Sequence, residues 1–287
     1  MISIVGLGNA ASAIVENFRS VKTYNVYQLN DKVAKSSKTK LKLKSFKNPE
    51  EYEQNIPNVK KFFANLDDQV QFFIVGSSLS SNYCLGILEQ IKEKKIDLVY
   101  VKPDIEMLTG TPALVENAVF GILQQYARSG LLNSMTIISN MSLETHLGNL
   151  PIKAYYTKLN EYIFSAMHHI NYFNHAEPEI GKVAAPAPIN RIRTICGLNI
   201  QNLEEKWFFE LDTPRELCYY LAINTERLEK EGGLHKKIVE MLKSKPKNAF
   251  RKMSYAIYET PYEDFGFCVA HTNVVQKNTL DKLTQVL

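Results

Sequence analysis

The chain has 287 residues, of which 45% are hydrophobic and 22% charged, a balance typical of globular proteins with a sizeable core. A net charge of +4 is too small to indicate nucleic-acid binding by itself, and the four cysteines and six histidines show no metal-ligand or disulfide spacing. The first residues have a strand pattern rather than that of a signal peptide, and no apolar run approaches about 18 residues, so we expect a cytoplasmic protein without a membrane span.

The first half of the chain alternates strand and helix patterns. Five short apolar runs predict strands, at residues 2–6, 25–30, 71–75, 97–101 and 134–139. Helical patterns follow several of them, at residues 12–19, 83–94 and 114–128. This alternation predicts an α/β fold with a parallel sheet between helices, in which ligands bind beyond the carboxyl ends of the strands.

A run of lysines lies between the second and third predicted strands. Its members are Lys32, Lys35, Lys38, Lys40, Lys42, Lys44 and Lys47. Such a run most often forms a solvated loop or an exposed edge hairpin, and a site for an acidic partner is the alternative.

A glycine turn, Gly-Leu-Gly-Asn-Ala-Ala at residues 6–11, joins the first strand to the first helix. Glycine permits a tight turn and close backbone approach, and the helix that follows offers free N–H groups to a phosphate. The same GxGxxA pattern, with Asp31 placed 23 residues after Gly8, also fits a Rossmann dinucleotide site. An NAD(P)-dependent oxidoreductase is therefore one interpretation, and a turn without a ligand is another.

A second loop of small polar residues follows the third predicted strand, at residues 76–82. It reads Gly-Ser-Ser-Leu-Ser-Ser-Asn and leads into a helix. We expect it to form a second phosphate cradle at the same edge of the sheet.

A long helix is predicted over residues 151–172. Tyr156 and Asn160 share one face of it, so an aromatic ring that can stack on a purine lies beside an amide that can bond the purine edge. An amphipathic packing helix with a polar rim is the alternative. Residues 181–190 interrupt the pattern, and beyond them we predict a helix over 233–243 and strands at 218–223, 253–258 and 266–270.

In this order along the chain, the motifs resemble those of the tubulin/FtsZ superfamily, and the small size resembles its divergent phage and plasmid members. The resemblance implies three parts. These are a Rossmann-like nucleotide-binding domain (1–150), a central helix with its following loop (151–180), and a smaller α+β, activation-like domain (181–287).

The resemblance also implies GTP or GDP as cofactor, with or without Mg²⁺, and a set of binding residues. Glu116, in Leu-Val-Glu-Asn at 114–117, corresponds to a ribose contact, and Asn140 to a guanine contact. Tyr156 corresponds to the residue that stacks on guanine, and Asn160 to the one that recognises its edge. Phosphate binding is implied for Gly6, Gly8, Asn9, Ser12, Gly76, Ser77, Ser78, Ser80, Ser81 and Asn82.

Two departures from the superfamily pattern bear on catalysis. The loop at 76–82 keeps one glycine of the family's signature, and Leu79 replaces a threonine. The segment 174–181 lies where the family inserts an acid into its neighbour's site. Glu177 and Glu179 are the catalytic candidates there, although their spacing differs from the motif and solvated surface acids are the alternative.

The expected function is therefore guanine-nucleotide binding coupled to head-to-tail filament formation, with weak or lost GTPase activity that requires a subunit interface. An adaptor protein would link the filament to DNA or a virion, since the chain has no direct nucleic-acid motif. The oxidoreductase and a non-hydrolysing structural relative remain as alternatives.

Overall fold

The computed structural model describes residues 1–246 and 251–277, and two units divide this part of the chain. The first unit contains Met1–Phe164 and the segment from Val275 onward, and the second contains Ser165–Val274. No helix in the described part of the chain is both long and apolar enough to cross a membrane.

Six parallel strands form the sheet of the first unit, in the order β3-β2-β1-β4-β5-β6. The central strand β1 is buried along its whole length, as expected for a parallel sheet covered on both faces. The strands are β1 (Ile2–Leu7), β2 (Tyr24–Asn30), β3 (Lys40–Lys42), β4 (Gln69–Val75), β5 (Lys95–Lys102) and β6 (Ser134–Ser139).

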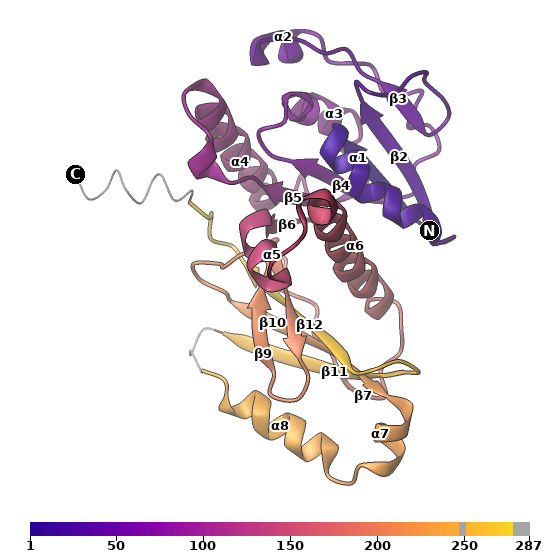
Figure 1. Cartoon of the computed structure of the whole chain (residues 1–287), viewed down its shortest axis with the longest axis vertical. Helices are drawn as coiled ribbons and strands as arrows, with labels where there is room; N and C mark the ends of the chain where they lie inside the picture. Colours follow the sequence, from indigo (N-terminus) through magenta and orange to yellow (C-terminus); the bar gives the residue numbers. More distant parts are fainter. Residues whose placement is uncertain (247–250, 278–287) are drawn as a thin grey trace, which may run out of the picture. The chain divides into compact units, whose positions relative to one another are not determined.

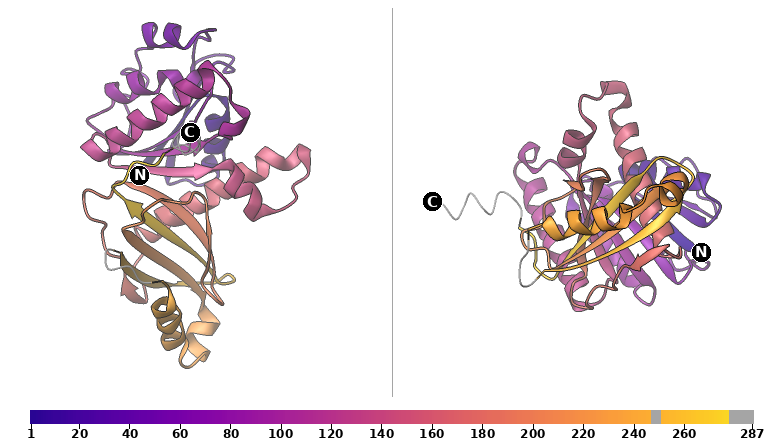
Figure 2. Two further views of the ribbon diagram at one scale, coloured as in Figure 1. Left: turned by 90° about the vertical axis from the view of Figure 1, so that its left-hand side faces the viewer. Right: turned by 90° about the horizontal axis from the view of Figure 1, so that it is seen from below.

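Helices lie on both faces of this sheet (Figures 1 and 2). Helix α1 packs so closely on β1 that a Cβ atom on Gly6 would lie 2.8 Å from the carbonyl oxygen of Ala11. The helices are α1 (Asn9–Glu16), α2 (Pro49–Gln54), α3 (Cys84–Gln90), α4 (Thr111–Ser129), α5 (Asn140–Leu147) and α6 (Tyr155–Phe173), and short 3₁₀ turns are η1 (Asn17–Ser20), η2 (Leu79–Tyr83), η3 (Ile105–Met107) and η4 (Ile152–Ala154). Helix α6 begins in the first unit and ends in the second.

A mixed sheet forms the second unit, in the order β9-β8-β12-β10-β11-β7. Strands β10 and β11 are parallel, and the other pairs are antiparallel. Leu234, Ile238 and Leu242 repeat every four residues along α8, so they form one apolar stripe that packs into the core of this unit. The elements are β7 (Ile180–Lys182), β8 (Ile192–Asn199), β9 (Glu204–Trp207), β10 (Glu216–Asn224), α7 (Thr225–Lys230), α8 (Leu234–Ser244), β11 (Lys252–Thr260) and β12 (Phe265–Thr272).

The predicted α/β class and the eight predicted strands are confirmed. Of the two forms expected for the lysine run, the solvated loop is present at residues 31–39 and the edge hairpin is not, because the edge strand β3 runs parallel to β2. Helix α1 begins three residues earlier than expected, and α6 begins only after the turn η4. The division at residues 150 and 180 stays a prediction.

Candidate functional site

The glycine turn after β1 has the conformation that its sequence predicts. Gly8 adopts a left-handed φ of +90°, and its N–H donates to the carbonyl of Leu29 at 2.7 Å. Two side-chain pairs support the turn: Asn9 donates to Asp31 at 2.8 Å, and Asn30 donates to the buried hydroxyl of Ser12 at 2.7 Å. The acid proposed for a dinucleotide ribose is thus already bonded to the turn.

The loop at 76–82 lies directly against this turn. A Cβ atom on Gly8 would lie 3.2 Å from the Ser78 hydroxyl oxygen and 3.4 Å from Cβ of Ser80. Ser81 donates from its backbone N–H to the carbonyl of Ser78 at 2.9 Å, which closes the first turn of η2. The absence of a side chain on Gly8 therefore keeps a small space between the two loops.

The hydroxyl of Ser78 faces this space. Its oxygen is buried and has no hydrogen-bond partner among the described residues. Buried hydroxyl groups are usually hydrogen-bonded, so an unpaired one is a sign that a partner from outside the chain belongs there.

Glu116, on the buried side of α4, fastens the start of the same loop. It is 2% exposed, and its carboxylate accepts hydrogen bonds from the backbone N–H of Ser77 at 2.6 Å and from the Tyr100 hydroxyl. Ser77 adopts a left-handed φ of +56°, which is strained for a residue with a side chain. Any Cβ on Gly76 would lie 2.6 Å from the Glu116 carboxylate, so this one glycine of the loop is required.

Burial determines the electrostatics of this carboxylate. Desolvation raises the pKa of Glu116, against the opposing effects of its bonds to Tyr100 and Ser77 and of the charge on Lys102. Desolvation and then the neighbouring Glu116 also raise the pKa of Tyr100 well above its usual value, so the phenol stays protonated and acts as a donor. A ribose contact by Glu116 would require the carboxylate to leave both partners.

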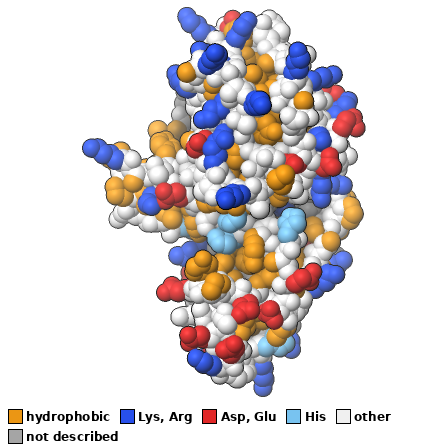
Figure 3. Space-filling view, turned by 90° about the vertical axis from the view of Figure 1, so that its right-hand side faces the viewer, with side chains coloured by type: hydrophobic (Ala, Val, Ile, Leu, Met, Phe, Trp, Pro, Cys, Tyr) orange, Lys and Arg blue, Asp and Glu red, His pale blue; other side chains and the backbone are white. Residues whose placement is uncertain are grey.

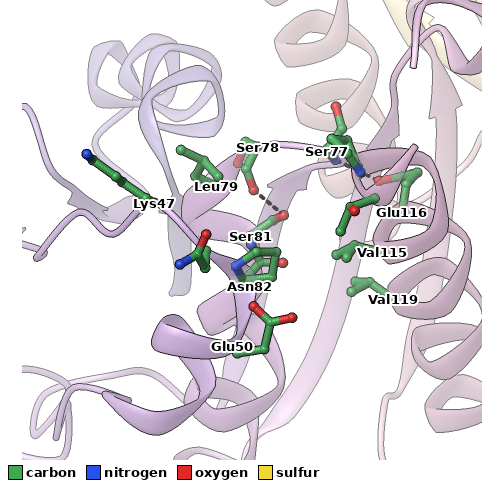
Figure 4. Close-up of a pocket in the computed structure, with 14 residues that line it drawn as sticks. Lys47, Glu50, Ser77, Ser78, Leu79, Ser81, Asn82, Val115, Glu116 and Val119 are labelled. Carbon is green, nitrogen blue, oxygen red and sulfur yellow. Dashed lines mark hydrogen bonds between the residues drawn. The ribbon is translucent and has the colours of Figure 1, made fainter. Parts of the chain in front are cut away.

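A pocket of about 370 Å³ opens beside the loop (Figure 4). Its walls are the loop itself, the start of α2 and the first turns of α4. Its lining is part polar, from Lys47, Glu50 and Asn82, and part apolar, from Val115 and Val119. The sequence interpretation missed the α2 wall, although a capping box with Asn48 and Glu51 marks the start of that helix.

The residues predicted to bind a base are not part of this pocket. Asn140 begins α5 at the carboxyl end of β6, the same sheet edge at which β1 and β4 end. Tyr156 is 70% exposed near the start of α6, and Asn160 is half-buried one turn later. No contact joins these three side chains to the 76–82 loop in the described residues, so the structure brings together the phosphate-side residues and Glu116 but not the base-side residues.

The catalytic candidates belong to the other unit. Glu177 and Glu179 are exposed in the segment between α6 and β7, and the backbone N–H of Glu179 donates to Ile257 at 2.8 Å. Each carboxylate is thus accessible to solvent or to another molecule.

No protein-family model and no curated protein matches this chain. Solved structures do match it along nearly all of its length. An FtsZ dimer from M. jannaschii has a TM-score of 0.68 and 12% identity, over 94% of this chain and 88% of that chain. CetZ from Methanosaeta thermophila has a TM-score of 0.69 and 12% identity, over 99% and 89%. A GTPγS-form protofilament of Bacillus thuringiensis serovar israelensis TubZ has a TM-score of 0.69 and 10% identity, over 99% and 89%.

These proteins share little sequence with the chain, and their likeness to it extends through both units. The order of the sequence motifs and the order of the strands thus indicate the same architecture as these solved structures. The chain has the fold of the tubulin/FtsZ superfamily.

Proposed function

We propose that this protein binds a guanine nucleotide in the cytoplasm and assembles head to tail into filaments. Proteins of the same fold provide the support, since they include an FtsZ dimer and TubZ protofilaments in GTPγS and GDP forms. A head-to-tail contact joins two different surfaces, so it extends into an open filament rather than a closed dimer.

The unpaired hydroxyl of Ser78 carries the nucleotide proposal. It is buried, it faces the space that Gly8 leaves open, and the start of α1 lies beside it. A phosphate oxygen in this space would accept the hydroxyl proton and would lie at a helix N-terminus, where anions are favoured. The residues of both loops therefore fit a phosphate group.

The rest of the nucleotide follows from the resemblance. Asn140 and Asn160 would bond the edge of guanine, and Tyr156 would stack on its face. Tyr156 suits this role because its ring is largely exposed and already oriented by an edge contact to Tyr155, with ring centroids 5.1 Å apart.

Ser78→Ala tests the proposal. The variant should be as stable as the parent or slightly more stable, because an unpaired buried hydroxyl costs about 1–3 kcal/mol. Its affinity for GTP should nevertheless fall by about 0.5–1.5 kcal/mol, the usual worth of one hydrogen bond. Ser20→Ala is the matched control, since that hydroxyl bonds only its own 3₁₀ turn, and it should leave nucleotide affinity unchanged. Equal GTP affinity in the Ser78 variant and the parent would contradict the proposed cradle.

An NAD(P)-dependent oxidoreductase is the second candidate, because Asp31 lies at the end of β2 beside the glycine turn. In that case Asp31→Ala would abolish binding of NAD, and Glu116→Gln, whose amide oxygen can still accept from Ser77, would leave it unchanged. Titration of both variants with labelled GTP and NAD separates the two functions. A third candidate, a structural relative without turnover, would bind nucleotide and assemble but release no phosphate.

A further inference from the structure

The lysines around β3 account for the net positive charge of the chain. Residues 32–47 contain seven lysines and no acidic residue. Subtracting these seven charges from the net charge of +4 leaves −3 for the rest of the protein. The positive charge is therefore local, and it belongs to one edge of the sheet.

Three of these lysines alternate along β3 and its short continuation, where the N–H of Leu43 still donates to Asn30 at 2.9 Å; we call them the lysine row: Lys40, Lys42 and Lys44. Leu41 and Leu43 point to the opposite side, where Leu43 is 4% exposed. Neighbouring members of the row are about 6.6 Å apart, since each residue of a strand advances about 3.3 Å. Figure 3 shows Lys and Arg side chains gathered over the part of the molecule where β2 and β3 lie in Figure 1.

These ammonium groups have few partners. Lys42 and Lys44 are exposed, and Lys40 has a carboxylate, that of Glu16, only at the limit of 4.0 Å. No other lysine of the 32–47 segment forms an ion pair within the described residues.

The outer backbone edge of β3 is closed. Ser37 donates its N–H to the carbonyl of Lys40 at 2.7 Å, and its hydroxyl accepts the N–H of Lys40 at 3.1 Å. The N–H of Lys42 donates to the hydroxyl of Ser36 at 3.0 Å. The outward N–H and carbonyl of Lys40 and the N–H of Lys42 are thus already bonded, which leaves a peptide strand little to pair with here.

We propose that the lysine row binds the phosphodiester backbone of duplex nucleic acid without sequence preference. Phosphates of one strand rise ~3.4 Å per step along a B-DNA axis and also wind around it, so lysines about 6.6 Å apart are spaced to meet neighbouring phosphates of one strand. The segment has one aromatic residue, Phe46, and its ring packs edge-on against Tyr52 at 5.3 Å, so no stacking platform for bases is present in it. The contact is with the backbone alone, and it needs no nucleic-acid motif.

Fluorescence anisotropy tests the proposal, with two labelled DNA duplexes of unrelated sequence and a duplex RNA across a series of salt concentrations. We expect similar affinities for both DNA sequences and a linear fall of log K with log salt. The K40Q/K42Q/K44Q variant should reduce the steepness of that line by roughly 2–3, because each phosphate contact contributes a slope of about 0.9. Equal affinity for the RNA duplex would show that phosphodiester chemistry alone is enough, and weaker affinity would show that the phosphate spacing of B-form DNA matters.

K236Q/K237Q/K243Q on α8 is the control, since it removes the same charge and also includes a lysine 4.0 Å from a carboxylate. It should leave the salt slope unchanged. Equal losses in the two triple variants would overturn the proposal, as would the absence of DNA binding at low salt. Binding of polyglutamate or of anionic phospholipid vesicles under conditions where DNA does not bind would overturn it as well. Unfolding curves of both variants verify that each is folded.

Discussion

Glu116→Ala should destabilise the protein strongly through the loop that this carboxylate fastens. The substitution leaves the hydroxyl of the fully buried Tyr100 and the N–H of Ser77 without their acceptor. Glu116→Gln differs, because its amide oxygen can accept from Ser77 while its NH₂ group donates to the Tyr100 oxygen. The two variants thus separate the lost bonds from the lost charge.

The expected size follows from the contacts. An unpaired buried donor costs about 1–3 kcal/mol, with the lower end appropriate for Ser77, which is near solvent. Loss of the one buried methylene group beyond Cβ adds about 0.8 kcal/mol. We therefore expect a loss of about 3–5 kcal/mol in Glu116→Ala and of less than about 1 kcal/mol in Glu116→Gln.

Urea unfolding of the parent, both variants and Tyr100→Phe measures these values, and a double-mutant cycle isolates the bond between Glu116 and Tyr100. The pH dependence supplies a second check. Because burial raises the folded pKa above the ordinary 4.5, the parent loses stability as pH rises from 4.5 through the folded pKa, and Glu116→Gln lacks that loss. A loss in Glu116→Ala below about 0.5 kcal/mol, or an additive cycle, would refute this reasoning.

Three further predictions concern the base, turnover and acid stability. Tyr156→Ala and Asn160→Ala should each weaken guanine-nucleotide binding by about 1–3 kcal/mol in titrations, and unchanged affinity in both would exclude α6 from the site. GTP hydrolysis should be slow or absent, and its rate should rise more steeply than the protein concentration. Glu177→Gln and Glu179→Gln should lower this rate without changing the affinity of the monomer for nucleotide. Brisk phosphate release that stays proportional to protein concentration, at dilutions where only monomers exist, would oppose a shared site. Burial, and then a nearby arginine, lowers the pKa of His271 from 6.5 to about 3, so the stability of the protein should fall as pH falls from 6.5 toward 3. In His271→Gln, the urea midpoint should no longer fall over this pH range.

Five strands of the parallel sheet were predictable from sequence because they are mainly apolar runs, whereas β3 is the polar triplet Lys40–Lys42 and was not predicted. The second unit was harder. Strand β8 (Ile192–Asn199) mixes polar and apolar residues, and its pairing with β12 joins positions more than 70 residues apart, such as Cys196 and Cys268. Its burial depends on that distant partner rather than on its own pattern.

The candidate site shows the same limit. Both loops follow from their glycine and serine residues, which indicate turns at helix starts. The link between Glu116 and the N–H of Ser77 spans 39 residues, and no local pattern in the sequence indicates which way that carboxylate points. The unpaired state of the Ser78 hydroxyl depends likewise on the conformation of its whole surroundings.

The chain returns to the first unit after residue 274, and this return has a consequence for folding during synthesis. Gln124 on α4 is completely buried, and its amide exchanges two hydrogen bonds with the backbone of Gln276, at 2.6 and 3.0 Å. A ribosome that has made all six strands of the first sheet has not yet made this partner. The first unit therefore stays incomplete until the entire second unit has been translated, and a chain that ends before Val275 retains a buried amide without its bonds.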